Sequence, residues 1–498
     1  MLSVCFFIFT LIKIDYSICL SRNKIKKGAS ISIAAWIKIK SRFFFSLSLI
    51  ITLTPITIKL MKKQFLLLLA LFNLTHSTVA QSKMDWFQDA KLGIFIHWGL
   101  YSVEGISESW SFYNGYLSHE DYLKQLHGFG AEKYNPKEWV DLIAQSGAKY
   151  TVITSKHHEG FALWNTKYGD LNAVKSSKAK RDVLTPFVEE VREKELKLGL
   201  YFSLPDWSYE DYTHHTKIKK RYQIKEAPKR WKKYLEYMNG QLEELKKNYT
   251  PDLWWFDGDW EHTAQEWGVD QIKARLTKNS PHIIFNSRLN GKGDYETPEI
   301  GIPVSRPEAK YWELCVTMND SWGFQKNDDN YKTPLQIIDL LVDCISKGGN
   351  LLLDIGPKAD GTIPKEQQHL LKELGKWTQK HSTAIYGTRR GIPYDHFYGP
   401  SALSKDNKTL FLYVRDIPKD GKIVLKGINN KINVAYVLGQ GSMLEQQTIC
   451  KVYWNKYPGI TYIEIPEEAL DPYYTVIALN LDGAIDLFGT KTGAIEQN

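Results

Sequence analysis

The stretch DLWWFDG (252–258) is a short apolar run that ends in a carboxylate and a glycine. Its apolar residues are continuous, as expected for a parallel strand covered on both faces. Six similar runs occur elsewhere: KLGIFIHWG (91–99), KYTVITSKHH (149–158), KLGLYFSL (197–204), HIIFNSR (282–288), KYWELCVTM (310–318) and NLLLDIG (350–356). The sequence therefore predicts at least seven buried strands of one parallel sheet.

Amphipathic segments separate these runs, and each has the spacing of a helix. They cover 135–146, 182–196, 227–247, 268–278 and 333–347. Strand–helix alternation over this length is typical of a parallel α/β fold. Seven strands, with an eighth obscured, favour a (β/α)8-like TIM barrel over a doubly wound sheet. No glycine-rich phosphate-binding loop follows a strand, so a nucleotide site has no support.

The pattern changes after Tyr386 to short alternating runs with turn signals between them. These runs cover 409–416, 422–428, 431–438, 451–455, 461–466 and 474–481. Such spacing predicts antiparallel strands packed as a β-sandwich. We therefore predict a catalytic barrel over 81–388 and a C-terminal β-sandwich accessory domain over 389–498.

The positive charge of the chain is uneven. The 498 residues carry a net charge of +8, yet the first 80 hold 11 Lys/Arg and a single acid. The remaining residues hold 53 bases and 55 acids, which removes the main argument for a nucleic-acid partner. Disorder is excluded because 43% of the residues are apolar, with 16 Trp and 28 Tyr among the aromatic residues.

The segment that starts at Met61 has the pattern of a secretory signal. Two lysines precede an apolar run, and small residues lead to a cleavage point before Gln81. We expect 61–80 to be a signal peptide and the mature chain to be periplasmic or extracellular, without stable membrane insertion. Residues 1–60 are expected to be an upstream mis-translated extension. The alternative for that extension is a membrane anchor, although its charge-free run 43–58 is shorter than the roughly 20 residues of a span.

Cysteine usage points away from a disulfide scaffold. After the predicted signal the chain keeps Cys315, Cys344 and Cys450, an odd number without a close pair. The core is therefore expected to be stable without disulfides.

In an α/β barrel the reactive groups lie at the carboxyl ends of the strands. Many polar and aromatic residues of this chain fall at or near these ends: His97, Trp98, His157, His158, Tyr201, Asp206, Asp257, Asp259, Arg288, Asp294, Glu299, Glu313 and Asp354. Aromatic rings beside carboxylates are typical of enzymes that act on sugars. The sequence thus indicates a carbohydrate site at this end of the barrel.

A glycoside hydrolase needs two carboxyl groups on either side of the scissile bond, one as nucleophile or base and one as acid. Asp257 is the best candidate for the nucleophile because it ends a strand and precedes a flexible glycine. Asp259 is the nearest alternative. A structural turn aspartate is the non-catalytic interpretation of Asp257.

Three histidines also allow a zinc hypothesis. Adjacent residues of a strand point to opposite faces, so His157 and His158 are not expected to bind one ion together. The sequence has no HxH or HExxH spacing there. We therefore expect the imidazoles to bind sugar hydroxyls, and a structural role for one of the pair is the alternative. We expect no metal and no cofactor.

Seven motifs in order resemble the retaining α-L-fucosidases of glycoside hydrolase family 29. They are WFQDAKLGIFIHWGLYSV, AKYTVITSKHHEGFALWNT, KLGLYFSLPDW, PDLWWFDGDW, GDYETPE, YWELCVTMNDSWGF and SKGGNLLLDIGPKADGTIP. The resemblance covers about residues 84–365 and implies a TIM barrel followed by a β-sandwich. It also implies an exo-acting enzyme that releases terminal α-L-fucose from an oligosaccharide or glycoconjugate, with no cofactor. The oligomeric state stays open.

The resemblance assigns roles to individual residues. Asp257 would be the nucleophile and Glu299, in the TPE motif, the acid/base; Glu313 is the second candidate for the acid/base. The residues that would bind fucose are His97, His157, His158, Tyr201, Trp255 and Arg288.

One segment departs from the family pattern. Many members carry Glu-Trp-Tyr after the first strand, whereas this chain has SESWSFY (107–113). Trp110 matches the tryptophan, but Ser109 stands at the position of the glutamate. Glu108 would replace that glutamate only after a shift of one residue. Two alternative functions also stay open: an exo-glycosidase for α-L-galactosides, and an inactive carbohydrate-binding homologue.

Overall fold

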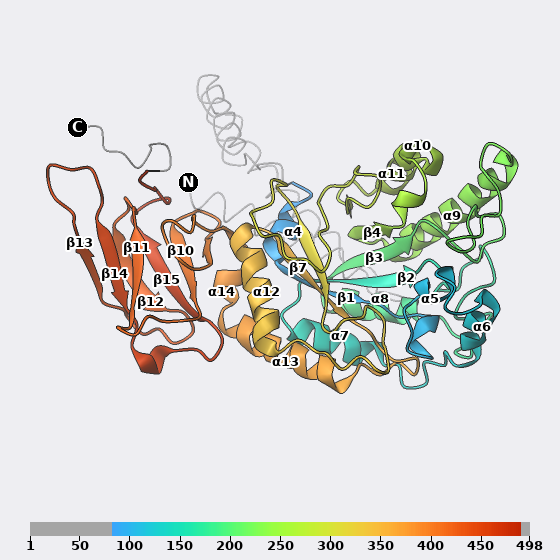
Figure 1. Cartoon of the computed structure of the whole chain (residues 1–498), viewed down its shortest axis with the longest axis horizontal. Coiled ribbons are helices and arrows are strands. Elements are labelled where there is room, and N and C mark those ends of the chain that lie inside the picture. Colours follow the sequence, from blue (N-terminus) through green and yellow to red (C-terminus); the bar gives the residue numbers. More distant parts are fainter. Residues whose placement is uncertain (1–81, 490–498) are drawn as a thin grey trace, which may run out of the picture. The chain divides into compact units, whose positions relative to one another are not determined.

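A computed structural model describes residues 82–489 (Figure 1). The predicted extension 1–60 and signal peptide 61–80 lie outside the described residues, as do residues 490–498. Between residues 82 and 489, no helix has both the length and the apolar character needed to cross a bilayer.

The seven predicted barrel strands are confirmed and pair in parallel. They are β1 (Leu92–Ile96), β2 (Tyr150–Lys156), β3 (Lys197–Ser203), β4 (Leu253–Asp257), β5 (Ile284–Phe285), β6 (Glu313–Thr317) and β7 (Asn350–Ile355). Their order in the sheet is β5-β4-β3-β2-β1-β7-β6. The two edge strands, β5 and β6, are therefore the ones between which a barrel must close.

An extended segment between β5 and β6 takes the eighth position. It makes parallel bridges on both sides, from Tyr295 to Asn286 after β5 and from Glu299 to Cys315 of β6. The N–H of Cys315 also donates to the carbonyl of Pro298 (3.1 Å). This obscured strand is polar and contains a proline, so it lacks the apolar run by which the others are recognised. The prediction of a (β/α)8-like barrel is confirmed.

Helices cover the outer face of the sheet. They include the five predicted ones, α7 (Pro136–Gln145), α8 (Leu184–Glu193), α9 (Pro228–Tyr249), α11 (Val269–Thr277) and α12 (Pro334–Lys347), and also α13 (Lys365–Lys380), which was not predicted. Thr333 caps α12 with a reciprocal capping box to Gln336, and Gly348 ends the helix in the left-handed region. Shorter helices are α4 (Asp85–Ala90), α5 (Trp110–Tyr113), α6 (His119–Leu123), α10 (Ala264–Trp267) and α14 (Ser382–Ile385).

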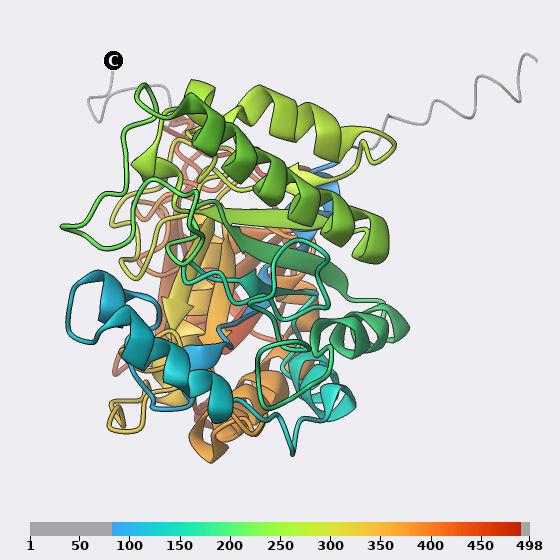
Figure 2. The same ribbon diagram turned by 90° about the vertical axis from the view of Figure 1, so that its right-hand side faces the viewer.

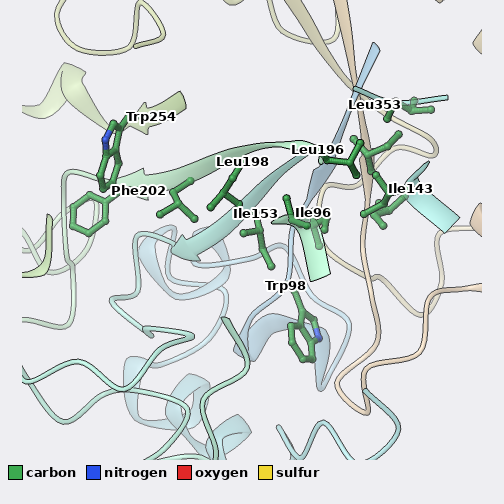
Figure 3. Packing of buried hydrophobic residues seen from close by; sticks show 14 of the residues in the cluster. Ile96, Trp98, Ile143, Ile153, Leu196, Leu198, Phe202, Trp254 and Leu353 are labelled. Carbon is green, nitrogen blue, oxygen red and sulfur yellow. The ribbon is translucent and has the colours of Figure 1, made fainter. Parts of the chain in front are cut away.

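Side chains alternate between the two faces of each barrel strand, which decides where the site can form. Outward residues such as Ile96, Ile153, Leu198, Phe202 and Trp254 belong to the large core between sheet and helices (Figure 3). Inward residues belong to a separate cluster: Phe95, Tyr150, Val152, Tyr201, Leu253, Trp255, Ile284, Tyr295, Cys315 and Leu352, joined by Phe87 of α4. Asp257 continues the inward row of Leu253 and Trp255, so its carboxylate emerges inside the barrel.

The strands from β8 onward form two antiparallel sheets. One has the order β12-β15-β10-β9-β8 and the other β11-β14-β13. Their bounds are β8 (Arg389–Arg390), β9 (Ser401–Leu403), β10 (Thr409–Val414), β11 (Lys422–Lys426), β12 (Ile432–Val437), β13 (Gln446–Ile449), β14 (Ile460–Glu464) and β15 (Thr475–Leu481). A shared apolar core between the sheets confirms the β-sandwich.

One predicted strand of the sandwich is wrong. The run 451–455 is not a strand but a turn, closed by a hydrogen bond from the N–H of Asn455 to the carbonyl of Val452 (3.3 Å). Its aromatic residues suggested a strand, but the chain has already left β13 at this point. The domain boundary between residues 388 and 389 stays a prediction.

Candidate active site

A cavity of about 150 Å³ lies at the carboxyl ends of the barrel strands. Figure 2 shows the molecule from the side of α5 and α6, which follow β1. The cavity is lined by Phe95, His97, Glu108, Trp110, His157, Tyr201, Trp255, Asp257, Trp260, Arg288, Glu299 and Trp322. Its volume is that of roughly five water molecules, which is the scale of a single sugar ring. Every predicted site residue except His158 lines it.

A larger open groove of about 900 Å³ lies along the loops between residues 287 and 312. Neither the histidines nor Asp257 line this groove. We therefore place the chemistry in the smaller cavity, where the titratable groups converge.

Asp257 ends β4 with both carboxylate oxygens engaged. The Tyr201 hydroxyl donates to Oδ2 (3.0 Å), and Nη1 of Arg288 donates to Oδ1 (3.1 Å). Gly258 follows with a φ of 82°, and a Cβ there would lie 2.2 Å from Cδ of Pro205. This glycine is needed because the chain must turn sharply against Pro205 directly after the carboxylate.

Asp259 has a different environment. Its Oδ2 accepts the N–H of Asn290 (2.5 Å), and the residue does not line the cavity. It therefore fixes the loop after β5. Of the two aspartates, the geometry selects Asp257 as the one that faces a ligand.

Arg288 joins the two carboxylates of the cavity. Its Nη2 donates to Oε2 of Glu299 (2.5 Å), while Nη1 holds Asp257. The guanidinium lies over the ring of Trp255, 4.7 Å from the ring centroid. The Glu299 side chain is 40% exposed, in contrast to the buried Asp257. Glu299 thus stands at the open side of the cavity and Asp257 at its floor.

Glu313 is fully buried and does not line the cavity. The Trp255 indole N–H donates to Oε1 (3.0 Å), and the Tyr150 hydroxyl donates to Oε2 (2.5 Å). Burial raises the pKa of this carboxyl to about 7. Glu313 therefore supports the ring of Trp255 from below, as expected for a structural partner.

His97 follows β1 as predicted, but His157 and His158 differ in placement from the prediction. Strand β2 ends at Lys156, so His157 and His158 are not paired residues of a strand pointing to opposite faces. Their rings lie 4.4 Å apart, centroid to centroid. Nε2 of His158 lies 3.5 Å from Oδ2 of Asp257, behind the residues that line the cavity. Leaving the strand allows both rings to approach one site.

Each imidazole is held through Nδ1. His97 binds Oδ1 of Asp354 (2.7 Å), and His157 binds the Ser109 hydroxyl (2.5 Å). The Ser109 hydroxyl donates its one hydrogen to Oε2 of Glu159 (2.5 Å), so it must accept from His157. By the same logic His158 donates to Ser203, whose hydroxyl donates to a carbonyl.

Nε2 of His157, a residue that lines the cavity, is therefore a hydrogen-bond acceptor, whereas Nε2 of His158 faces Oδ2 of Asp257. Burial lowers the pKa of His97 and of His158 well below the ordinary value, which keeps both rings neutral. Within residues 82–489, no group of three or more His, Cys, Asp or Glu side chains is arranged to hold a metal ion. The arrangement favours sugar hydroxyls as partners of the imidazoles.

In the segment SESW (107–110), the structure shows which residue faces the cavity in place of the glutamate expected from the family pattern. Glu108 lines the cavity, and its Oε1 accepts the N–H of Gly323 (2.7 Å). Its φ of 23° lies in the left-handed region, where the backbone of a residue other than glycine is strained. Ser109 turns away from the cavity to hold His157. The shift of one residue thus delivers Glu108 to the site.

Sequence reasoning missed several residues of the site. Phe95, Trp260 and Trp322 line the cavity, while Ser109, Glu159 and Ser203 support His157 and His158. Phe95 could have been found because it lies two residues before His97 on the inward face of β1. Asp354, which holds His97, was found as a strand-end residue, whereas Ser109 and Ser203 come from distant segments that no local signal marks.

The sequence model of the Alpha-L-fucosidase family matches residues 72–383. The chain belongs to this family. The alpha-L-fucosidase of Branchiostoma floridae is 32% identical over 375 residues, which cover 68% of this chain and 81% of that protein. The alpha-L-fucosidase of Dictyostelium discoideum is 28% identical over 428 residues, covering 78% and 90%. Membership makes the chain a glycoside hydrolase that releases α-L-fucose.

Solved fucosidase structures share the fold. Alpha-L-fucosidase isoenzyme 1 from Paenibacillus thiaminolyticus superposes with a TM-score of 0.73 at 30% identity, covering 80% of this chain and 99% of that one. An alpha-L-fucosidase from Bacteroides thetaiotaomicron superposes with a TM-score of 0.71 at 28% identity, covering 80% and 96%. The barrel followed by a β-sandwich is thus the architecture of the family.

Replacing Ser109 by Ala should lower kcat/KM by roughly tenfold, because His157 loses the partner that fixes its tautomer. Steady-state kinetics on an aryl α-L-fucoside measures the effect. Ser107→Ala, an exposed serine two residues earlier, is the matched control. Equal activity of both variants would show that His157 does not need this hydroxyl.

Replacing Glu313 by Gln should change the pH dependence of stability. With a folded pKa of about 7 against an ordinary 4.5, Glu313 keeps its proton in the folded state where the unfolded chain has lost it. Wild-type stability therefore falls as the pH rises from 4.5 to 7, by about 3 kcal/mol from this group. Denaturant unfolding at several pH values should show that the free energy of unfolding of the variant rises relative to that of the wild type between pH 4.5 and 7. Above pH 7 the difference should stay constant. A constant difference between pH 4.5 and 8 would contradict the raised pKa.

Proposed function

We propose that this enzyme cleaves terminal α-L-fucosides with retention, with Asp257 as nucleophile and Glu299 as acid/base. The observation that carries the proposal is the guanidinium of Arg288, which holds both carboxylates in one cavity. Asp257 at the floor would attack the anomeric carbon, and the bond to the leaving oxygen would break as Glu299 protonates it. Water, deprotonated by Glu299, would then release fucose from Asp257.

The walls of the cavity suit a 6-deoxy sugar. His97 and His157 offer ring nitrogens to sugar hydroxyls, and Glu108 adds a carboxylate beside His157. The rings of Phe95, Trp255 and Trp322 supply an apolar surface for the methyl group. Hydroxyls on one side and a methyl on the other distinguish fucose from an ordinary hexose.

The ion pair between Arg288 and Glu299 bears on the sequence of steps. A carboxylate paired with a guanidinium is in the form that serves as base in the second step. To act as acid in the first step, Glu299 must carry a proton and leave the guanidinium. We propose that entry of the substrate separates the two side chains, which the exposed position of Glu299 permits.

Two neighbours support this proposal. The Bacteroides thetaiotaomicron enzyme has been trapped as a covalent intermediate with 2-fluoro-fucosyl fluoride, using a glutamate-to-glutamine mutant. The Thermotoga maritima alpha-fucosidase, 30% identical with a TM-score of 0.65, has been solved in complex with fucose. We also propose export of the chain, on the strength of the signal pattern at 61–80.

Asp257→Ala should lower kcat by at least about a thousandfold, because no covalent intermediate can form. Asp259→Ala, which removes the neighbouring carboxylate, should keep more than a tenth of the wild-type rate. Turnover of an aryl α-L-fucoside by purified, folded variants measures both. A larger loss in the Asp259 variant than in the Asp257 variant would reverse the assignment.

Glu299→Ala should lower turnover of fucosides with poor leaving groups by about 10²–10⁴-fold. Sodium azide should restore the rate on an activated aryl fucoside, because the anion attacks the glycosyl–enzyme without a base. The product would be a fucosyl azide of retained configuration, identified by NMR. Azide rescue of Glu313→Ala, without rescue of Glu299→Ala, would transfer the role to Glu313.

A further inference from the structure

The positive charge of the barrel is concentrated in one segment. Residues 214–233 hold nine Lys/Arg and one Glu, a net charge of +8. The residues from 81 onward contain 53 bases and 55 acids in total, so the remainder of that part is acidic. A local charge of this size on an acidic protein creates a strong positive potential at one place on the surface.

The first part of this segment is a hairpin. His214 and Lys220 form an antiparallel bridge, and the N–H of Arg221 donates to the carbonyl of Thr213 (2.7 Å). Arg221 is itself structural, because its guanidinium donates to the carbonyls of Trp207 and His214. Ile218 at the tip is 95% exposed. The hairpin is therefore held at its base and projects into solvent.

Three lysines of the hairpin are available to a ligand. Lys217, Lys219 and Lys220 are exposed. The ion pairs formed among residues 82–489 include none of them, whereas Lys233 and Arg230 further on are paired with Asp211. Lys220 acts on the Glu261 carboxylate only from beyond ion-pair distance, so among residues 82–489 no ion pair neutralises the charge of the hairpin, and that charge favours an anion.

The hairpin lies beside the mouth of the cavity. The N–H of Lys217 donates to the carbonyl of Tyr113 (2.9 Å), and Nδ1 of His214 lies 3.6 Å from Oε2 of Glu261. These contacts reach the two short segments that carry Trp110 and Trp260, whose rings stack at 6.4 Å and line the cavity. The hairpin is therefore joined by direct contacts to two segments that form the wall of the cavity.

We propose that the hairpin Lys217–Lys220 binds anionic substituents, sulfate esters or carboxylates, on the glycan from which fucose is removed. The proposal rests on the proposed function, because the cavity must hold the fucosyl end of the same molecule. Exposed lysines act as point charges and favour anions without demanding one geometry. Such a field raises the rate of encounter with an acidic substrate and weakens as salt is added.

The test compares substrates that differ only in charge. They are a sulfated fucosyl oligosaccharide, its desulfated form, a sialylated fucosyl oligosaccharide with its desialylated form, and a neutral aryl α-L-fucoside. The variant is Lys217→Gln/Lys219→Gln/Lys220→Gln. The matched control, Lys408→Gln/Lys431→Gln/Lys451→Gln, removes the same charge from exposed lysines of the β-sandwich.

At low salt the hairpin variant should lose about tenfold in kcat/KM on at least one anionic substrate and stay within about twofold on the neutral ones. The wild type should lose this preference as salt is added, and the control variant should behave like the wild type. Sulfated against sialylated substrates then tell which anion is favoured.

Two results would overturn the inference. One is a wild type that treats the charged and neutral forms of each glycan alike. The other is a hairpin variant that keeps its rates on both anionic glycans but loses binding to duplex DNA or to anionic vesicles, which would assign the patch to another partner. A wild type inactive on the aryl fucoside as well would instead refute the proposed function.

Discussion

The site depends on one partly buried cation. The guanidinium of Arg288 lies on the ring of Trp255 and reaches Asp257 with one nitrogen and Glu299 with another. Two carboxylates in one small cavity would repel each other, and a lone guanidinium would be costly to bury. Together the three groups balance their charges, and this balance holds both carboxylates in the same cavity.

Glu299 reaches the cavity because the barrel is irregular between β5 and β6. The chain between β5 and β6 has no covering helix and crosses the gap as a polar, proline-containing strand. The segment that closes the sheet is also the one that carries Glu299 to the rim. Below it, Glu313 holds Trp255 from the inside of the barrel. The same segment therefore closes the barrel and positions the proposed acid/base.

Recognition of the sugar depends on support from outside the cavity. Asp354, Ser109 and Ser203 come from different loops and strands, yet each fixes one imidazole through Nδ1. The cavity is thereby set to receive hydroxyl hydrogens before any substrate enters. Outside the cavity, the proposed role of the lysine-rich hairpin is to bind anionic groups on the glycan that carries the fucose.

The sequence by itself determined the seven apolar strands, five helices, the β-sandwich and the strand ends at which His97, Tyr201, Asp257 and Arg288 lie, because burial and strand ends leave local signals. It could not show the eighth strand, whose pairing depends on neighbours distant in the chain, and it mistook 451–455 for a strand. The sequence and the family resemblance favoured Asp257 over Asp259 and Glu299 over Glu313, but only the tertiary structure shows which carboxylate of each pair lines the cavity. Local sequence gives the same carboxylate in each case, and burial and hydrogen-bond partners, which distant segments supply, decide what that carboxylate does.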